Sequence, residues 1–133
     1  DTAIQQNVAV WSGGGIQADL DTTLTVSGST LERNEASDGG GLLNQGSTTL
    51  LNTTFSGNTA NNNGGAINSR TANARLMIRN STLPANKAAN SAGGSSLFAT
   101  QGASLLNTIV AGNSSPNAAD VSGTFSDQGG SLV

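Results

Sequence analysis

The chain has 133 residues, a formal net charge of −3, and neither cysteine nor histidine. Its length fits one domain, and the lack of a basic surplus argues against nucleic-acid binding. Disulfides, thiolate metal sites and the commonest general base are excluded because the residues are missing. No apolar run approaches the ~20 residues of a membrane helix. We therefore expect no membrane span, no metal and no cofactor.

The first 16 residues are interpreted as a lead-in coil that ends in a glycine block. They contain the apolar residues Val8, Val10 and Trp11. Residues 20–26 (LDTTLTV) then alternate apolar and polar side chains in their second half. This period of two is typical of a β-strand.

A repeat then organises residues 17–119. Its clearest copy is NTTFSGN at 52–58, and related stretches occupy 28–34, 80–86 and 107–113. Glycine blocks begin at residues 13, 39, 64 and 93, so that they lie 25 to 29 residues apart. This period, with many small polar residues and few helix formers, indicates a β-solenoid rather than helical repeats.

Apolar columns define the predicted cross-section. One column is Val26, Leu50, Ile78 and Leu105, and a second is Leu31, Phe55, Leu83 and Val110. Members of the two columns are five residues apart, and an odd separation would place them on opposite faces of one strand. A corner must therefore lie between them. A third column is Ile16, Leu42 and Ile67, followed by Ser96 or Leu97. We predict three short strands per coil.

The repeat resembles those of right-handed parallel β-helices with the pectate-lyase-like architecture. The motif NTTFSGN, followed by glycines and isoleucine, is similar to repeats of bacterial cell-surface proteins, including polymorphic outer-membrane proteins. Residues 120–133 resemble the end segment of such repeats. The resemblance implies an all-β right-handed parallel β-helix of about four to five coils, forming a single domain over residues 1–133. It also implies an extracellular or cell-surface location, although the chain shows no signal peptide.

A polar column accompanies the apolar ones. Asn34, Asn58, Asn86 and Asn113 each follow the second column by three residues. Because stacked coils lie about 4.8 Å apart, we predict that these amides form a hydrogen-bonded ladder. The glycosylation pattern N-x-[ST] begins at Asn52, Asn80 and Asn113. We interpret these asparagines as corner and ladder residues instead.

Two hydroxyl rows raise the possibility of an ice-binding face. They are Ser29, Thr53, Ser81 and Thr108, and beside them Thr30, Thr54 and Thr82. Adjacent residues of a strand point to opposite sides, so only one row can face solvent. Ile109 interrupts the second row. A solvated strand surface is the simpler interpretation.

The candidate catalytic residues are Asp19, Asp21 and Lys87. Asp19 and Asp21 share one loop, whereas no predicted column holds acids in adjacent coils. Polysaccharide lyases and glycosidases need clustered carboxylates, which the predicted columns do not supply. A Ser–Lys pair would need Lys87, the only lysine, beside Ser91 or Ser114. A Ser–His–Asp triad is excluded without histidine.

We expect a secreted or surface repeat module for binding or scaffolding rather than an enzyme, with carbohydrate as a possible ligand. The alternative is a small hydrolase, esterase or polysaccharide lyase that works without histidine. Activity should lie where the repeat is broken, at 18–22, 69–75 and 87–98. Open solenoid ends favour association, so we expect a homo-oligomer formed through the ends or an apolar side. Trp11 and Phe98, and the segment 121–133, are expected to cover the core.

Overall fold

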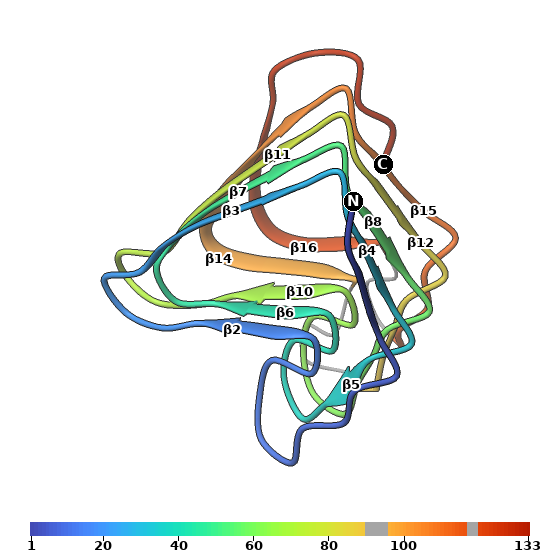
Figure 1. Cartoon of the computed structure of the whole chain (residues 1–133). Coiled ribbons are helices and arrows are strands. Elements are labelled where there is room, and N and C mark those ends of the chain that lie inside the picture. Colours follow the sequence, from blue (N-terminus) through green and yellow to red (C-terminus); the bar gives the residue numbers. More distant parts are fainter. Residues whose placement is uncertain (90–95, 117–119) are drawn as a thin grey trace.

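The computed structural model describes residues 1–89, 96–116 and 120–133. All regular structure in these ranges is β-strand, and every strand pair is parallel. Successive coils stack on one another around a common axis (Figure 1). The predicted all-β parallel β-helix is therefore confirmed.

The first sheet takes one strand from each coil, and a narrow second sheet follows it along the chain. The first sheet contains β1 (Ala3–Gln5), β4 (Thr30–Glu32), β8 (Thr54–Ser56), β12 (Thr82–Pro84) and β15 (Ile109–Ala111). The second contains β5 (Glu35–Ala36), β9 (Thr59–Ala60) and β13 (Lys87–Ala88).

The third sheet is the largest and has two halves that meet at a corner. One half contains β2 (Ile16–Ala18), β6 (Leu42–Asn44) and β10 (Ile67–Ser69); the other contains β3 (Thr23–Ser27), β7 (Ser47–Leu51) and β11 (Arg75–Arg79). The long strand β14 (Leu97–Leu106) runs through both halves, and β16 (Val121–Asp127) pairs with it. The three coils that begin at β4, β8 and β12 thus contribute to three sheets as predicted, while all coils before that of β12 divide the third strand at the corner.

The core has the predicted register. Val26, Leu50, Ile78 and Leu105 pair in sequence across β3, β7, β11 and β14. Leu31 pairs with Phe55, and Leu83 with Val110. The third column continues from Ile67 to Leu97, not Ser96. All of these residues but Val26 and Ile16 are at most 1% exposed, so stacking buries them in one continuous core.

The corner between the third and first sheets explains the Asn-Thr and Asn-Ser pairs of the repeat. Gly28, Asn52, Asn80 and Asn107 occupy it in successive coils, with φ between 49° and 55°. Glycine and asparagine are the residues that best tolerate this left-handed conformation. The predicted corner between the first two columns is confirmed. The expected glycine block at 93–94 lies outside the described residues.

The two ends of the β-helix are not covered by apolar side chains in the way that we expected from the sequence. Trp11 is 79% exposed, so the expectation that it covers the core is wrong, because the first coil has a neighbouring coil on one side only. Phe98 is half-buried, and Phe125 packs partly against the core. Leu132 and Val133 are 61% and 57% exposed and do not cover it. Instead, β16 continues the stack as a further coil.

Candidate functional site: a lateral groove beside a hydrogen-bonded stack

The predicted asparagine ladder is present and runs in one direction. Asn34 Nδ2 donates to Asn58 Oδ1 at 3.0 Å, Asn58 Nδ2 to Asn86 Oδ1 at 2.9 Å, and Asn86 Nδ2 to Asn113 Oδ1 at 3.1 Å. The same acceptors also receive the backbone N–H of the preceding asparagine. Asn34 and Asn58 are fully buried. The ladder is therefore structural, because its polar groups satisfy one another inside the fold.

The ladder has two members that the repeat pattern did not identify. At the first coil, Asn7 Nδ2 donates to Asn34 Oδ1 at 2.9 Å. At the other end, Asp120 Oδ1 accepts Asn113 Nδ2 at 2.8 Å. Asn7 follows Ile4 by the same three residues that separate Asn34 from Leu31, so that spacing could have revealed it. Asp120 lies only seven residues after Asn113, outside the repeat spacing.

Of the two hydroxyl rows, the first points inward. Thr53, Ser81 and Thr108 are buried, and Thr53 Oγ1 lies 3.0 Å from Ser81 Oγ. The second row, Thr30, Thr54 and Thr82, is half-buried on the outside of the first sheet. Asn52 and Asn80 are exposed corner residues, and Asn107 Nδ2 donates to Asn80 Oδ1 at 3.0 Å.

The predicted catalytic residues do not meet. Asp19 and Asp21 are exposed at the corner between β2 and β3, where Gln17 Nε2 donates to Asp19 Oδ1 at 2.7 Å. Lys87 is exposed on β13 of the second sheet, in register with Thr59 and Ser114. In Figure 1 the β2–β3 corner lies at the far left and β5 of the second sheet at the bottom. Ser91, the other expected partner of Lys87, lies outside the described residues.

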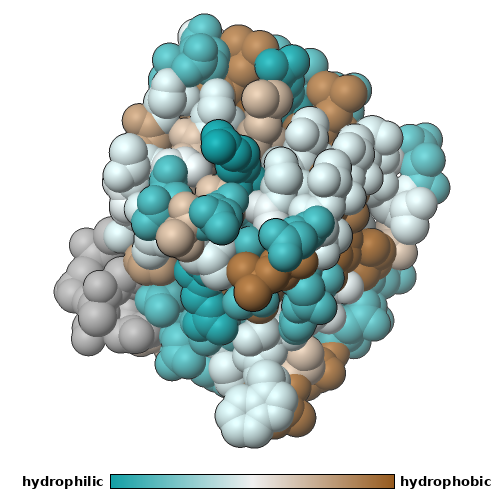
Figure 2. All heavy atoms as spheres, turned by 90° about the vertical axis from the view of Figure 1, so that its left-hand side faces the viewer, coloured by the Kyte–Doolittle hydropathy of each residue, from teal (hydrophilic) through white to brown (hydrophobic). Residues whose placement is uncertain are grey.

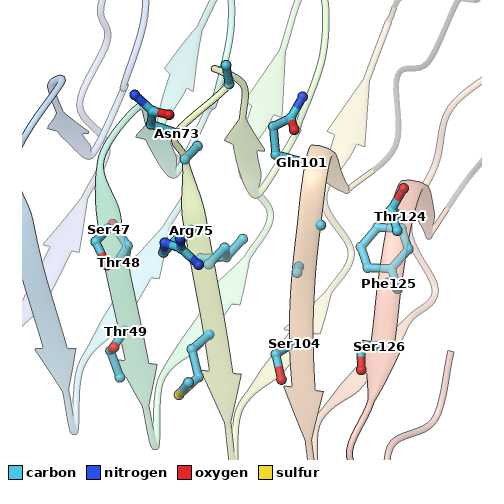
Figure 3. A pocket seen from close by; sticks show the side chains of 16 residues that line it. Ser47, Thr48, Thr49, Asn73, Arg75, Gln101, Ser104, Thr124, Phe125 and Ser126 are labelled. Atoms are coloured by element: carbon cyan, nitrogen blue, oxygen red, sulfur yellow. The ribbon is translucent and has the colours of Figure 1, made fainter.

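A shallow groove of about 680 Å³ lies on the outer face of the second half of the third sheet. Figure 3 shows its side chains in two rows across β7, β11, β14 and β16. Ser47, Arg75 and Thr124 belong to the row nearer the corner; Thr49, Met77, Ser104 and Ser126 form the other. Asn73 and Gln101 stand above them at the corner.

The surroundings of the groove are mostly polar. Figure 2 shows the side of the molecule that carries this corner, where hydrophilic residues and residues of intermediate hydropathy cover most of the surface and hydrophobic residues form small groups. A smaller hollow of about 250 Å³, lined by Leu20, Asp21 and Gln45 among others, shares Ser47, Asn73 and Arg75 with the groove. The two hollows therefore meet at Arg75.

Among the residues that the structure describes, Arg75 is the one charged residue that lines the larger groove. Its backbone is fixed, because its N–H donates to Gly46 O at 2.9 Å and its carbonyl accepts Asn44 Nδ2 at 3.0 Å. Within the described ranges, ion pairs join Arg33 to Glu32 and Arg70 to Asp38, and Arg75 takes part in neither. An exposed guanidinium on a fixed strand offers a planar set of donors to a carboxylate or phosphate ligand.

Residues 72–74 line the groove, and the two residues before them are anchored by hydrogen bonds. Arg70 Nη1 donates to Asp38 Oδ2 at 3.0 Å, and Thr71 Oγ1 donates to Gln45 O at 2.8 Å. Asp38 is 8% exposed and also accepts Asn68 Nδ2 at 3.1 Å. The break in the repeat at 69–75, singled out from the sequence, thus borders the groove. The break at 18–22 borders the smaller hollow through Leu20 and Asp21.

Two further observations bear on the classes of function. Among the described residues, no three His, Cys, Asp or Glu side chains gather closely enough to hold a metal ion. The described part of the chain also forms no helix with the length and apolarity needed to cross a bilayer.

Comparison with known proteins gives one match. The family model of the Chlamydia polymorphic membrane protein repeat matches residues 52–70, which run from the corner Asn52 through β8, β9 and β10 to Arg70. No curated protein and no solved structure matches the chain. The resemblance found in the repeat is therefore confirmed: the chain is a β-helix repeat protein and contains a segment that matches the polymorphic membrane protein repeat.

Proposed function

We propose that the chain is a secreted or cell-surface repeat module whose lateral groove binds an extended polar ligand, with an acidic carbohydrate as the first candidate. The observation that carries this proposal is the exposed Arg75, which has no acidic partner among the described residues and lies in one row of the groove with Ser47 and Thr124. The match to a polymorphic membrane protein repeat supports a cell-surface location.

The spacing of the rows favours a chain-like ligand. Neighbouring parallel strands lie about 4.8 Å apart, which is close to the length of one sugar residue. A ligand lying across the strands would therefore meet Thr49, Met77 and Ser104 at regular intervals. Arg75 can hold a carboxylate through paired hydrogen bonds, and the hydroxyls can bind sugar hydroxyls.

Binding of uronic-acid-containing and neutral oligosaccharides, measured by titration calorimetry, tests the proposal. Arg75→Ala should weaken binding of the acidic ligand roughly tenfold or more, the usual cost of a lost charged hydrogen bond. Arg79→Ala is the matched control, because Arg79 is an exposed arginine on the same strand outside the groove. Equal affinities of both variants and the unmodified chain would reject the groove as the binding site.

Association of copies belongs to the same proposal. Val8, Val10 and Trp11 in the first coil are 75%, 77% and 79% exposed, and β1, β2 and β3 have a free edge there among the described residues. We propose that copies associate through this end, which would bury apolar surface and edge strands. Light scattering should show a mass above that of the monomer, and Trp11→Ser should lower it. A monomer at all concentrations would contradict this.

The enzymatic alternative lacks a comparable observation. Lys87 lies on the second sheet, apart from Asp19 and Asp21, so no described arrangement joins a base to a pair of carboxylates. A hydrolase or lyase activity therefore stays a prediction, tested by turnover of polysaccharides and esters and its loss in Asp19→Asn, Asp21→Asn or Lys87→Ala. An ice-binding face also stays a prediction, tested by thermal hysteresis.

A further inference from the structure

The two ends of the asparagine ladder are chemically different. In every step the amide N–H of one coil donates to the Oδ1 of the next, from Asn7 through Asn34 to Asn113. Asn7 therefore begins the ladder, and no donor in the described residues reaches its Oδ1. The ladder ends at Asp120, whose carboxylate accepts hydrogen bonds and donates none.

Asp120 stands in the place of an asparagine from a further coil. Its Oδ1 accepts the backbone N–H of Asn113 at 3.1 Å and Asn113 Nδ2 at 2.8 Å. Asn113 Oδ1 accepts the same pair of donors from Asn86 at 2.8 and 3.1 Å. The amide N–H groups all point toward this carboxylate, so its negative charge lies at the positive end of the aligned side-chain dipoles.

The backbone position of Asp120 explains how its side chain reaches this place. Its carbonyl accepts the N–H of Leu97, just as the carbonyl of Ala66 accepts the N–H of Leu42. Asp120 thus follows Ser96 in the column that also contains Gly41 and Ala66. A Cβ on Gly41 would lie 2.6 Å from Ala66 O and 2.7 Å from Phe55 Cδ1. A long side chain is tolerated at Asp120 because, among the described residues, no further coil packs there.

We propose that Asp120 caps the asparagine ladder and blocks head-to-tail stacking of a second copy on this end of the helix. A second copy stacked in continuation would bring its own Asn7 to the place that the Asp120 carboxylate occupies. Its Asn7 Oδ1 would then meet another acceptor instead of Asn113 Nδ2, which costs free energy in a buried contact. The inference concerns this end alone and stands whether or not copies associate through the first coil.

The cap itself is tested by amide hydrogen exchange at Asn113. Asp120→Gly places at this position the residue type of Gly41 and removes the acceptor, so the exchange rate of Asn113 N–H should rise roughly tenfold or more. Asp120→Asn keeps an acceptor oxygen and should leave the rate within about threefold of the unmodified chain. The Asn58 N–H serves as a check that both variants remain folded. Unchanged exchange at Asn113 in Asp120→Gly would overturn the cap.

The block is tested by adding a second change. Leu132 N donates to Thr108 O at 2.9 Å, and Leu132 O accepts the N–H of Val110 at 2.9 Å. Residues 131–133, here called the tail, therefore also cover the edge of β15. Leu132→Pro removes the tail's donor. Combined with Asp120→Gly, it should produce particles whose mass grows with concentration, as seen by light scattering.

The matched control combines Leu132→Pro with Asp120→Asn, which keeps a side chain in the blocking position and should leave the mass at that of the unmodified chain. Adding Asn7→Ala to the associating variant should reduce its association, because the acceptor on the second copy is lost. If both double variants associate equally, or if neither does, Asp120 does not block stacking.

Discussion

Two corners of the β-helix contrast in how strictly they repeat. At the ladder corner, each coil supplies one asparagine that makes the same hydrogen bonds as its neighbours. At the corner between the halves of the third sheet, the connection is four residues long at 19–22, two at 45–46 and five at 70–74, and β14 has none. The asparagine bonds to both neighbouring coils hold the ladder corner to one length, whereas, among the described residues, the corner between the halves of the third sheet has no side-chain bond that repeats in every coil and varies in length. The groove lies beside the variable corner.

The largest expected effect comes from breaking the ladder at its centre. Asn58→Ala removes the acceptor of two Asn34 N–H groups and the donor to Leu31 O and Asn86 Oδ1, all buried. The free energy of unfolding should fall by roughly 3–5 kcal/mol, because several buried polar groups lose partners. Urea denaturation measures this. Asn62→Ala, at an exposed position, should change it by less than about 0.5 kcal/mol; similar losses in both variants would reject a special role for the ladder.

A second test adds volume between coils. A Cβ at Gly40 would lie 2.4 Å from Thr59 O and 2.5 Å from Gly65 O, so Gly40→Ala should lower the free energy of unfolding by roughly 2–3 kcal/mol. Gly112→Asn is the control, since a Cβ there meets nothing within 4 Å and asparagine tolerates its φ of 72°. Thermal unfolding compares the two. Equal melting temperatures would show that the coils can separate without cost.

The variable corner is tested through its anchor. Asp38→Asn removes the charge that holds Arg70 while keeping the shape of the side chain. We expect a loss of about 1–2 kcal/mol in unfolding free energy, as for a charged hydrogen bond, and faster amide exchange over residues 70–74. Glu32→Gln breaks the exposed pair with Arg33 and should change stability by less than about 0.5 kcal/mol. Slow exchange of the 70–74 amides in Asp38→Asn would show that other contacts hold the groove wall.

The smallest effect concerns the exposed turn after β16. Asp127 has a lowered pKa, first because the Gly129 N–H donates to its carboxylate, at 2.9 Å, and second because of the Ser131 hydroxyl. A lowered folded-state pKa means that the ionised group stabilises the turn fully above the unfolded pKa of about 3.9. This contribution is lost as the pH falls through the lower folded value.

The Gly129 amide resonance followed by NMR should therefore titrate below pH of about 3.9. In Asp127→Asn this titration should disappear. A midpoint above that value in the unmodified chain would contradict the hydrogen-bond assignment.

The ladder corner could be predicted from the sequence, and the groove could not. Phe55, Asn58 and the glycines after them recur at fixed spacings, and stacking converts fixed spacing into contact between neighbouring coils. The register of the apolar columns and the ladder therefore followed directly. Trp11 was misjudged because hydrophobicity predicts burial only where a neighbouring coil is present to cover the residue.

The exposure of Arg75 could not be predicted from the spacing of the repeat. Its register beside Ser47 followed from the repeat, but its exposure between two hollows depends on the path of residues 70–74 and on the Asp38–Arg70 pair. Asp120 is similar, since it completes the ladder from a position outside the repeat.

The sequence by itself determined the β-helix, its three sheets and the order of residues in its core and ladder, because identical residues at a fixed period must stack on one another. Only the tertiary structure decided where the repeat ends and which polar residues face a common hollow. Those features depend on loops and side chains that break the period, and their positions follow from contacts between coils rather than from spacing along the chain.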